Sequence, residues 1–354
     1  MSESFKVKSS IQDYEVHFVS SLEEQLQKVY RKGDYIIVDE VVENLHPELK
    51  KVLETDKNVI SINAIEKTKS YEGVIPFIEE LIKSGFKRNN RLIAIGGGIT
   101  QDVTAYIASM LYRGVGWIFF PTTLLAQGDS CIGSKTSINF REFKNQVGGF
   151  YPPVSIYIAP MYLKTLGERD IRSGIGEMAH YYFVSGEEDV TFFEHEFETA
   201  LKDQSNLGEI IRKSLSIKKS YIEIDEFDKN ERIVFNYGHT FGHAIESITN
   251  YGIPHGVAVS FGMNMANFIS VKKGYLQHDN FERAHKIFQI IWKGYSINDL
   301  DLDSLLSAME KDKKNENGKL GLILTKGWGH MFKDLTEPDE TFISWMQEYL
   351  ETYH

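Results

Sequence analysis

The first half of the chain alternates short apolar runs with longer amphipathic stretches. Polar and apolar residues alternate in a strand-like way over residues 4–20. Apolar runs follow at residues 34–39, 91–95, 117–121 and 154–158. Runs of this length are typical of buried parallel strands, and the amphipathic segments at residues 71–84 and 101–111 predict intervening helices. The pattern predicts an α/β domain that ends near residue 165.

Beyond residue 165 the pattern changes to helical periodicity. A helix is predicted from about residue 166, with Gly174 and Gly176 permitting close packing, and residues 257–291 are typical of an amphipathic helix. A charged turn then leads into a short apolar strand at residues 320–325. We therefore expect two domains, residues 1–165 and residues 166–354, of which the second is mostly helical.

A glycine-rich turn follows the apolar run at residues 91–95. Gly96-Gly97-Gly98 lies between this strand and a helix, where backbone N–H groups can approach a pyrophosphate at a helix N-terminus. This context favours nucleotide binding, although the glycines do not match G-x-G-x-x-G and a tight turn also explains them. Asp39 either holds a ribose hydroxyl or caps the next helix, and Thr122-Thr123 offers hydroxyls to the same crevice.

Residues 129–145 are polar and crowded with groups that bind anions. The segment contains Asp129, Lys135, Thr136, Asn139, Arg141, Lys144 and Asn145. Glycines on both sides favour a defined loop, whereas the composition is equally well explained by a solvated one.

Three histidines in the second half have spacing that suits a metal site. His239 and His243 leave one face of a helix predicted to include residues 241–248, and His255 follows in a turn bounded by proline and glycine. Imidazole is the commonest protein ligand for zinc-like ions, so the three rings form a candidate ligand set. Each is also explained, taken singly, as a surface or core histidine.

Glu177 lies in an apolar helix, one turn before His180. A free carboxylate is costly to bury, so Glu177 is either at the surface or paired with a cation, of which a metal is one. Further along the chain, Lys218 and Arg232 flank an acidic stretch at residues 223–228.

The composition is that of an ordinary globular protein. Of the 354 residues, 42% are hydrophobic and 25% are charged, and the net charge of -11 argues against general nucleic-acid binding. The single Cys131 excludes an internal disulfide and suits a reducing compartment. Because no apolar run has the length of a signal peptide or membrane span, we expect a cytoplasmic protein without a membrane partner.

Taken in order, these motifs resemble those of the 3-dehydroquinate synthase family, the sugar-phosphate cyclases, over nearly the whole chain. The resemblance begins with Gly96-Gly97-Gly98 and Asp102 and ends with His255-Gly256. Between them lie Leu111-Tyr112-Arg113-Gly114, residues 121–127, residues 129–136, Lys144-Asn145, Glu177 and residues 238–246. It implies a Rossmann-like NAD-binding α/β domain followed by a mostly α-helical metal-binding domain.

The resemblance also implies roles for the matched residues. Glu177, His239 and His255 match the ligands of a divalent metal, zinc or cobalt, whereas His243 matches a histidine that contacts substrate and relays protons. The cofactor motifs contain Asp39, Glu66, Lys69, Gly97, Gly98, Asp102, Thr122, Thr123 and Lys144. The substrate motifs contain Arg113, Asp129, Lys135, Asn145, His180, Lys218, Arg232, Asn236 and Lys314.

Within the substrate motifs, the family pattern separates two anion sites. Lys135, Asn145, Asn236 and Lys314 resemble groups that grip a phosphate, and Arg113 resembles one that completes this site from the neighbouring subunit of a homodimer. Lys218 and Arg232 resemble the pair that binds a substrate carboxylate, and Asp129 resembles a residue that orients hydroxyls or the nicotinamide side.

The family reaction, as the resemblance implies it, is redox-neutral overall. NAD⁺ oxidises a secondary alcohol with help from the metal, phosphate leaves by β-elimination, the hydride returns, and ring opening and an aldol step form a carbocycle. Lys218 and Arg232 favour 3-deoxy-arabino-heptulosonate 7-phosphate or its amino analogue as substrate, whereas His180 departs from the family's Glu-x-x-Lys pattern. Alternatives are a cyclase acting on sedoheptulose 7-phosphate or glucose 6-phosphate, a metal-dependent polyol dehydrogenase, and a non-catalytic binding protein.

Overall fold

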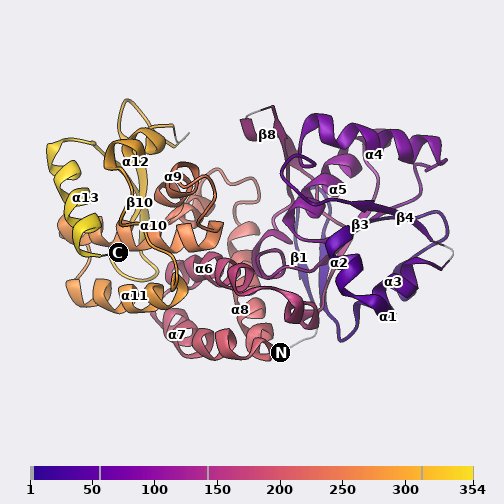
Figure 1. Cartoon of the computed structure of the whole chain (residues 1–354), viewed down its shortest axis with the longest axis horizontal. Coiled ribbons are helices and arrows are strands. Elements are labelled where there is room, and N and C mark those ends of the chain that lie inside the picture. The colour runs from indigo at the N-terminus through magenta and orange to yellow at the C-terminus, as the bar shows by residue number, and fades with distance from the viewer. Residues whose placement is uncertain (1–3, 56, 142, 312–313, 354) are drawn as a thin grey trace. The chain divides into compact units, whose positions relative to one another are not determined.

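The structure is a computed structural model and describes residues 4–55, 57–141, 143–311 and 314–353. The chain forms two compact units, Met1–Leu166 with Ile222–Phe227, and Gly167–Tyr221 with Asp228–His354 (Figure 1). Side chains of Ile222–Phe227 bind the first unit directly. Glu223 Oε1 accepts a hydrogen bond from the Lys8 backbone N–H at 2.9 Å, and Glu226 Oε2 accepts one from that of Ser10 at 2.8 Å.

The first unit is built on a seven-stranded sheet in the order β1-β2-β9-β6-β5-β3-β4. Its strands are β1 (Ser4–Val7), β2 (Tyr14–Phe18), β3 (Tyr35–Asp39), β4 (Asn58–Ile62), β5 (Leu92–Gly96), β6 (Trp117–Pro121) and β9 (Ser155–Ile158). Neighbouring strands are parallel except for the β1-β2 pair. The prediction of buried parallel strands from the apolar runs is confirmed.

Helices connect these strands and cover the sheet. They are α1 (Leu22–Val29), α2 (Glu40–Leu45), α3 (Pro47–Leu53), α4 (Tyr71–Lys83) and α5 (Gly98–Met110). Leu26 of α1 and Leu49 of α3 pack with Ile93 of β5 in one core. The predicted start of α5 near residue 101 is wrong, because the helix begins within the glycine-rich turn itself, at Gly98.

The polar segment predicted as a loop is instead a β-hairpin. β7 (Lys135–Phe140) pairs antiparallel with β8 (Phe143–Phe150), after a π-helical turn, Ala126–Ser130. Thr136 and Asn139 are buried although both are polar. The prediction failed because a strand that buries polar side chains lacks the alternation of apolar residues from which strands are recognised.

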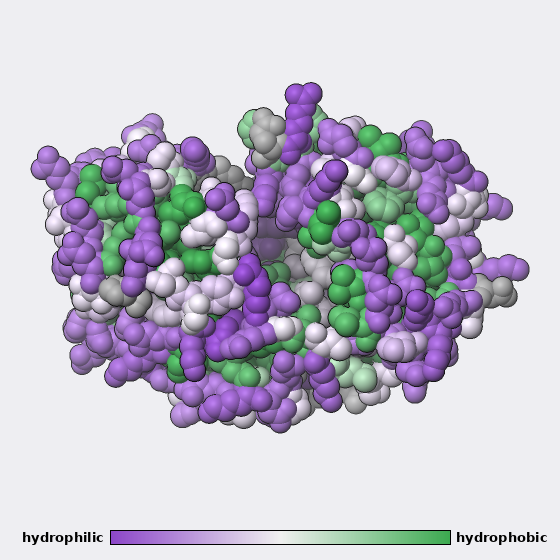
Figure 2. All heavy atoms as spheres, in the orientation of Figure 1, coloured by the Kyte–Doolittle hydropathy of each residue, from purple (hydrophilic) through white to green (hydrophobic). Residues whose placement is uncertain are grey.

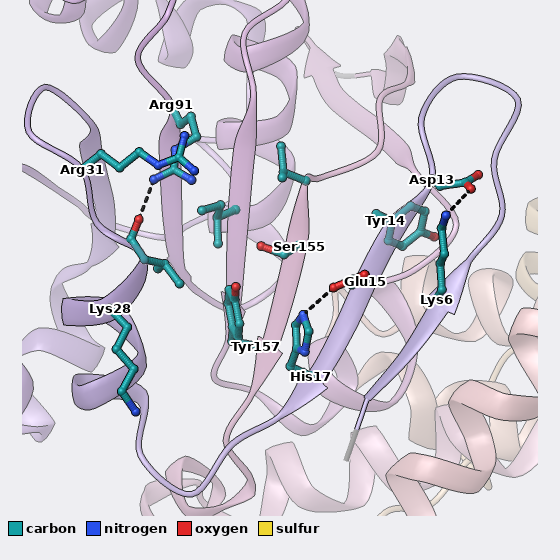
Figure 3. Close-up of a pocket in the computed structure, with 13 residues that line it drawn as sticks. Lys6, Asp13, Tyr14, Glu15, His17, Lys28, Arg31, Arg91, Ser155 and Tyr157 are labelled. Atoms are coloured by element: carbon teal, nitrogen blue, oxygen red, sulfur yellow. Dashed lines mark hydrogen bonds and ion pairs between the residues drawn. The ribbon is translucent and has the colours of Figure 1, made fainter. Parts of the chain in front are cut away.

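A cavity of about 520 Å³ lies along β2 and β9 and reaches the amino-terminal ends of β5 and β9 (Figure 3). Its walls include His17, Arg31 and Tyr157, and Figure 3 shows Lys6 paired with Asp13. Ligands of parallel sheets bind at the carboxyl ends of the strands. The part of this cavity lined by Arg91 and Ser155 therefore lies at the opposite ends of the strands from the glycine-rich turn.

The second unit is mostly helical, as predicted. Its helices are α6 (Glu168–Ser185), α7 (Glu187–Lys202), α8 (Leu207–Ile222), α9 (His239–Ile248), α10 (His255–Lys272), α11 (His278–Ile291), α12 (Leu302–Met309) and α13 (Glu340–Thr352). β10 (Leu320–Thr325), at the position of the predicted strand, pairs antiparallel with β11 (Met331–Thr336). α7 buries Val190, Phe193 and Phe197 on one side, and hydrophilic residues predominate along its outer side in Figure 2.

The stretch predicted as one amphipathic helix, residues 257–291, is two helices. The chain turns between α10 and α11 at Gly274, whose φ of 72° suits glycine. α10 is also buried on nearly all sides from Gly256 to Ser270, so it has no polar face exposed to solvent. Among the described residues, no helix combines the length and apolarity that crossing a membrane requires.

Candidate functional site

Three helices of the second unit converge where the metal ligands are predicted. α10 packs against both α6 and α9. A Cβ on Gly176 of α6 would lie 2.2 Å from the backbone O of Gly256, and one on Gly256 would lie 1.8 Å from that of Ser173. No side chain fits at either position, so the small residues of α6 allow the two helices to approach closely.

Glu177 is at the centre of this convergence and is only 4% exposed. Its Oε1 lies 3.5 Å from His239 Nε2, and its Oε2 lies 3.2 Å from His255 Nε2. Two ligands of a tetrahedral zinc ion, bound at about 2.0–2.2 Å, lie roughly 3.3–3.6 Å apart, close to both separations. The ligand atoms of Glu177, His239 and His255 all lie within 4.8 Å of one another.

Both histidines are oriented to bind an ion through Nε2. His239 Nδ1 lies 3.2 Å from the backbone O of Tyr237, and His255 Nδ1 lies 2.9 Å from Glu246 Oε2. A carbonyl and a carboxylate only accept hydrogen bonds, so Nδ1 carries hydrogen in both rings. In the neutral ring the Nε2 lone pair then faces Glu177, as a metal ligand requires.

The charges of this cluster also favour a cation. Burial alone raises the pKa of Glu177, but the charges and hydrogen bonds of His255 and His239 outweigh it and hold this pKa well below its usual value. Burial likewise opposes a charge on His255, yet the carboxylates of Glu177 and Glu246 raise its pKa well above the ordinary value. The ligand atoms of Glu177, His239 and His255 therefore favour a positive charge between them. A divalent ion can supply this charge in place of a proton.

The three imidazoles grouped by their spacing do meet. The His243 ring lies 5.5 Å from that of His239 and 5.7 Å from that of His255, centre to centre, and His243 is exposed. The local prediction for His255 was wrong, because it is the first residue of α10, capped by Pro254, and not part of a turn. His239 likewise begins α9, two residues before the predicted helix.

His180 borders the same cluster and is 1% exposed. Its Nδ1 lies 2.5 Å from the backbone O of Glu177, one turn earlier on α6, and its ring centre lies 5.3 Å from that of His239. The carbonyl accepts the hydrogen on Nδ1, which orients the His180 ring relative to the backbone of the candidate ligand.

The two cations predicted to bind a carboxylate are buried in the second unit. Lys218 of α8 is 6% exposed, and Arg232, in the 3₁₀ turn Glu231–Asn236, is 4% exposed. The Phe235 ring packs against Tyr181 of α6 and Tyr221 of α8, which holds the three segments together. Buried cations are rare in proteins.

Asn236 and Lys314 also belong to the second unit. Asn236 ends the 3₁₀ turn and its Nδ2 donates to the backbone O of Ile233 at 3.1 Å. Lys314 is half-buried, and its backbone O would lie 2.3 Å from a Cβ on Gly321 of β10.

The residues of the cofactor motifs lie beyond the carboxyl ends of the strands in the first unit. Asp39 ends β3 and caps α2 by accepting a hydrogen bond from the Val41 backbone N–H at 2.9 Å, and burial raises its pKa. Thr122 and Thr123 follow β6. Gly97 caps α5, and a Cβ there would lie 2.8 Å from Thr123 Cγ2, so the two motifs are in contact.

An ion pair joins the loop after β4 to α5. Lys69 Nζ lies 2.6 Å from Asp102 Oδ2, and Asp102 Oδ1 accepts a hydrogen bond from the Ser137 backbone N–H at 3.3 Å. Burial raises the pKa of Asp102, although Lys69 acts in the opposite direction. Because Ser137 belongs to β7, this pair ties the cofactor motifs to the hairpin on which Lys135, Lys144 and Asn145 are exposed.

Asp129 and Arg113 lie in irregular segments of the first unit. Asp129 is in the π-helical turn, where Ser130 Oγ donates to Gln101 Oε1 and Gln101 Nε2 donates to the Ser130 backbone O, both at 2.6 Å. Turns of this kind often occur at functional sites. Arg113 is exposed and has a φ of 67°, just before Gly114 with a φ of 114°.

Two family models match consecutive parts of the chain. The model of the 3-dehydroquinate synthase N-terminal region matches residues 59–173, and that of the C-terminal region matches residues 174–315. The 3-dehydroquinate synthase of Dictyoglomus turgidum is 38% identical over 304 residues, which are 83% of this chain and 85% of the relative. The chain belongs to the 3-dehydroquinate synthase family.

Further comparisons agree with this family assignment. The 3-dehydroquinate synthase of Dictyoglomus thermophilum is 35% identical over 345 residues, 95% of this chain and 96% of the relative. The solved structure of 2-deoxy-scyllo-inosose synthase complexed with carbaglucose-6-phosphate, NAD⁺ and Co²⁺ matches with a TM-score of 0.87 at 22% identity, covering 99% of this chain and 100% of that one. The chain thus has the fold of the 3-dehydroquinate synthase family, and the family is one of enzymes.

Glu246 is the residue of the histidine cluster that the sequence interpretation missed. It lies on α9, and its carboxylate binds His255, the first residue of the next helix. The available signal was its position one turn after His243, within a motif shared with the 3-dehydroquinate synthase family. Helical spacing does not show that the partner of Glu246 is His255, because that contact depends on how α9 and α10 pack.

We expect Glu246→Gln to weaken zinc binding about 10–100-fold without abolishing it, because a neutral amide makes His255 a less basic and less firmly oriented ligand. Titration with zinc against a competing chelator measures the affinity. Glu282→Gln is the matched control, since Glu282 lies 3.6 Å from His278 on α11, outside the cluster, and should leave the affinity unchanged. Equal affinities for the Glu246 variant and the wild type would contradict the assignment.

Proposed function

We propose that the protein is an NAD- and divalent-metal-dependent cyclase that converts 3-deoxy-arabino-heptulosonate 7-phosphate to 3-dehydroquinate and releases phosphate. The observation that carries the proposal is the cluster of buried Glu177 with half-buried His239 and His255 in a chain of this family. Relatives that are 35–38% identical are named 3-dehydroquinate synthase. We place the reaction in the cytoplasm, in the shikimate pathway of aromatic amino acid biosynthesis.

In this proposal Glu177, His239 and His255 hold the metal, which is zinc or cobalt. A bound divalent ion polarises a secondary alcohol of the substrate and makes it easier to deprotonate. The hydrogen bonds at Nδ1 of both histidines keep Nε2 available to the ion. His243 is exposed beside these ligands, where an imidazole suits the transfer of protons to and from a substrate.

The first unit binds NAD in this proposal. In this role the amino terminus of α5, with Gly97 and Gly98, donates backbone N–H groups to the pyrophosphate. Asp39, at the end of β3, accepts hydrogen bonds from ribose hydroxyls. Glu66, Lys69, Asp102, Thr122, Thr123 and Lys144 complete the cofactor site. Bound NAD⁺ supplies a reversible hydride acceptor, so the reaction produces no net NADH.

Two groups of basic and amide side chains serve the anionic ends of the substrate. Lys135, Asn145, Asn236 and Lys314 bind the phosphate, and a second copy of the chain in a homodimer supplies its exposed Arg113. Cationic donors stabilise a leaving phosphate because its charge increases as the bond breaks. Lys218 and Arg232 bind the carboxylate, and Asp129 orients the hydroxyls.

A second candidate is a sister cyclase that uses sedoheptulose 7-phosphate, glucose 6-phosphate or an amino analogue. His180 favours it, because this buried imidazole adjoins the candidate ligands where the family pattern has a lysine. An imidazole need not carry the fixed positive charge of a lysine, and the substrate beside it then differs in its substituents.

Phosphate release by the purified protein with NAD⁺ and zinc or cobalt tests the proposal. We expect release from 3-deoxy-arabino-heptulosonate 7-phosphate, without accumulation of NADH. Release only from sedoheptulose 7-phosphate or glucose 6-phosphate would favour the second candidate. Net NADH without phosphate release would instead indicate a polyol dehydrogenase, and no turnover of any of these substrates would contradict both cyclase candidates.

A further inference from the structure

Asn139 connects two parts of the first unit that carry different predicted functions. It lies on β7 and is 6% exposed, which is unusual for an amide side chain without a structural or functional task. The β7-β8 pairing shifts its register between Ile138 and Phe140, so Asn139 stands at an irregularity of the hairpin. Such irregularities often redirect a side chain toward a site.

On one side, Asn139 binds the loop after β4. Its backbone N–H donates to the backbone O of Lys69 at 2.9 Å, and its Nδ2 donates to Glu66 Oε2 at 2.8 Å. Glu66 and Lys69 belong to the predicted cofactor motif, and Lys69 also pairs with Asp102. The Asn139 amide therefore sets the direction of the Glu66 carboxylate, which is otherwise exposed.

On the other side, Asn139 binds the residue predicted to grip phosphate. Its Oδ1 accepts a hydrogen bond from the Asn145 backbone N–H at 3.0 Å. Asn145 has a φ of 54°, a left-handed conformation that needs support from its surroundings. Ser137 Oγ donates to Asn145 Oδ1 at 3.2 Å, so the amide nitrogen of Asn145 is the end left to donate to a ligand.

We propose that Asn139 is a positioning residue that holds the Glu66 carboxylate and the Asn145 backbone together, and so couples the NAD subsite to the phosphate subsite within the first unit. This inference rests on the proposed function for the identity of the two ligands. Asn139 itself touches neither ligand, because both of its side-chain groups are engaged by Glu66 and Asn145. It acts through these two residues.

The Glu66 contact is tested with Asn139→Asp in two backgrounds, measuring NAD⁺ affinity by titration calorimetry. In the natural background the new carboxylate faces Glu66, and we expect NAD⁺ binding to weaken about tenfold, the scale of one lost hydrogen bond to a charged group. In the Glu66→Gln background the partner can donate to the new carboxylate, so the same substitution should cost about twofold or less. A double-mutant cycle isolates this coupling from any direct effect of Glu66.

The Asn145 contact is tested with Asn139→Ser, whose shorter side chain reaches neither partner and adds no charge. We expect it to raise the KM for 3-deoxy-arabino-heptulosonate 7-phosphate about tenfold more than Asn139→Asp does, because an aspartate still accepts from the Asn145 N–H. Asn58→Asp is the matched control for lost stability, since Asn58 Nδ2 donates to the Asp34 backbone O at 3.1 Å in the same unit. It should change neither NAD⁺ affinity nor KM.

The results separate this inference from the proposed function. If the wild type binds NAD⁺ and Asn139→Asp has equal effects in both backgrounds, the coupling through Glu66 is overturned while the proposed function stands. Loss of NAD⁺ binding in Asn58→Asp to the same degree would also overturn it, by showing a general effect of stability. A wild type that binds no NAD⁺ would overturn the proposed function, and this inference with it.

Discussion

Glu177→Ala is expected to abolish phosphate release and to weaken zinc binding by about three orders of magnitude. The variant removes the carboxylate that faces both His239 and His255. Of the two carboxylates beside His255, only that of Glu246 then remains. Of the three assigned ligands, only the imidazoles of His239 and His255 then remain. Zinc stoichiometry and affinity of the purified variant, measured against a chelator, provide a readout that does not depend on the choice of substrate.

Glu177→Gln and Glu168→Gln complete this experiment. The first keeps the shape of the buried side chain, so loss of zinc with retained thermal stability separates a missing ligand from a misfolded protein. Glu168 lies on the same helix and is 75% exposed, so its variant should bind zinc like the wild type. Unchanged zinc affinity in a folded Glu177→Ala protein would show that the metal site lies elsewhere.

Arg232→Ala is expected to lower kcat/KM for 3-deoxy-arabino-heptulosonate 7-phosphate about 100- to 1,000-fold, mainly through KM. Arg232 is 4% exposed, and losing one partner of a buried charge pair typically costs about 2–5 kcal/mol. The kcat/KM of Arg232→Lys should lie between those of the wild type and Arg232→Ala, because a lysine keeps the charge but not the paired donors of a guanidinium. Steady-state kinetics with each variant measures the effect.

A structural arginine provides the control for Arg232. Arg283 of α11 pairs with Glu187 and Glu194, so Arg283→Ala should lower the thermal stability and leave KM unchanged. With sedoheptulose 7-phosphate, which has no carboxylate, Arg232→Ala should have little effect on any measurable turnover. If Arg232→Ala leaves both KM and turnover unchanged with the sugar acid, the carboxylate role of Arg232 is wrong.

The buried strands of the sheet could be predicted from the sequence because each apolar run by itself indicates a buried strand. β3, β5 and β6 are buried along almost their whole length, and an apolar run of that length has few other stable placements. The turn at Gly97 and the helix cap at Ser70 are likewise local, since the cap binds the Gly73 backbone N–H only three residues away. Local features of this kind can be predicted without knowledge of the fold.

The hairpin and the helix boundaries could not be predicted in the same way. Asn139 is buried because its partners are Lys69, Asn145 and Glu66, the last of which is 73 positions away in sequence. Polar side chains that are buried through such hydrogen bonds cannot be predicted from a pattern of hydrophobic residues. The break between α10 and α11 was missed because the segments on both sides have helical periodicity, and Gly274 was not read as the turn between them.

By itself, the sequence determined the α/β unit, the mostly helical unit after it and the motifs that place the chain in its family, because these depend on neighbouring residues and their order. Only the tertiary structure decided that Glu177, His239 and His255 direct their donors at one point, and that Glu246 and Asn139 support residues on other segments. Contacts between helices depend on how closely their backbones approach, which here requires Gly176 and Gly256. That approach is a property of packing in three dimensions, and no spacing along a single helix specifies it.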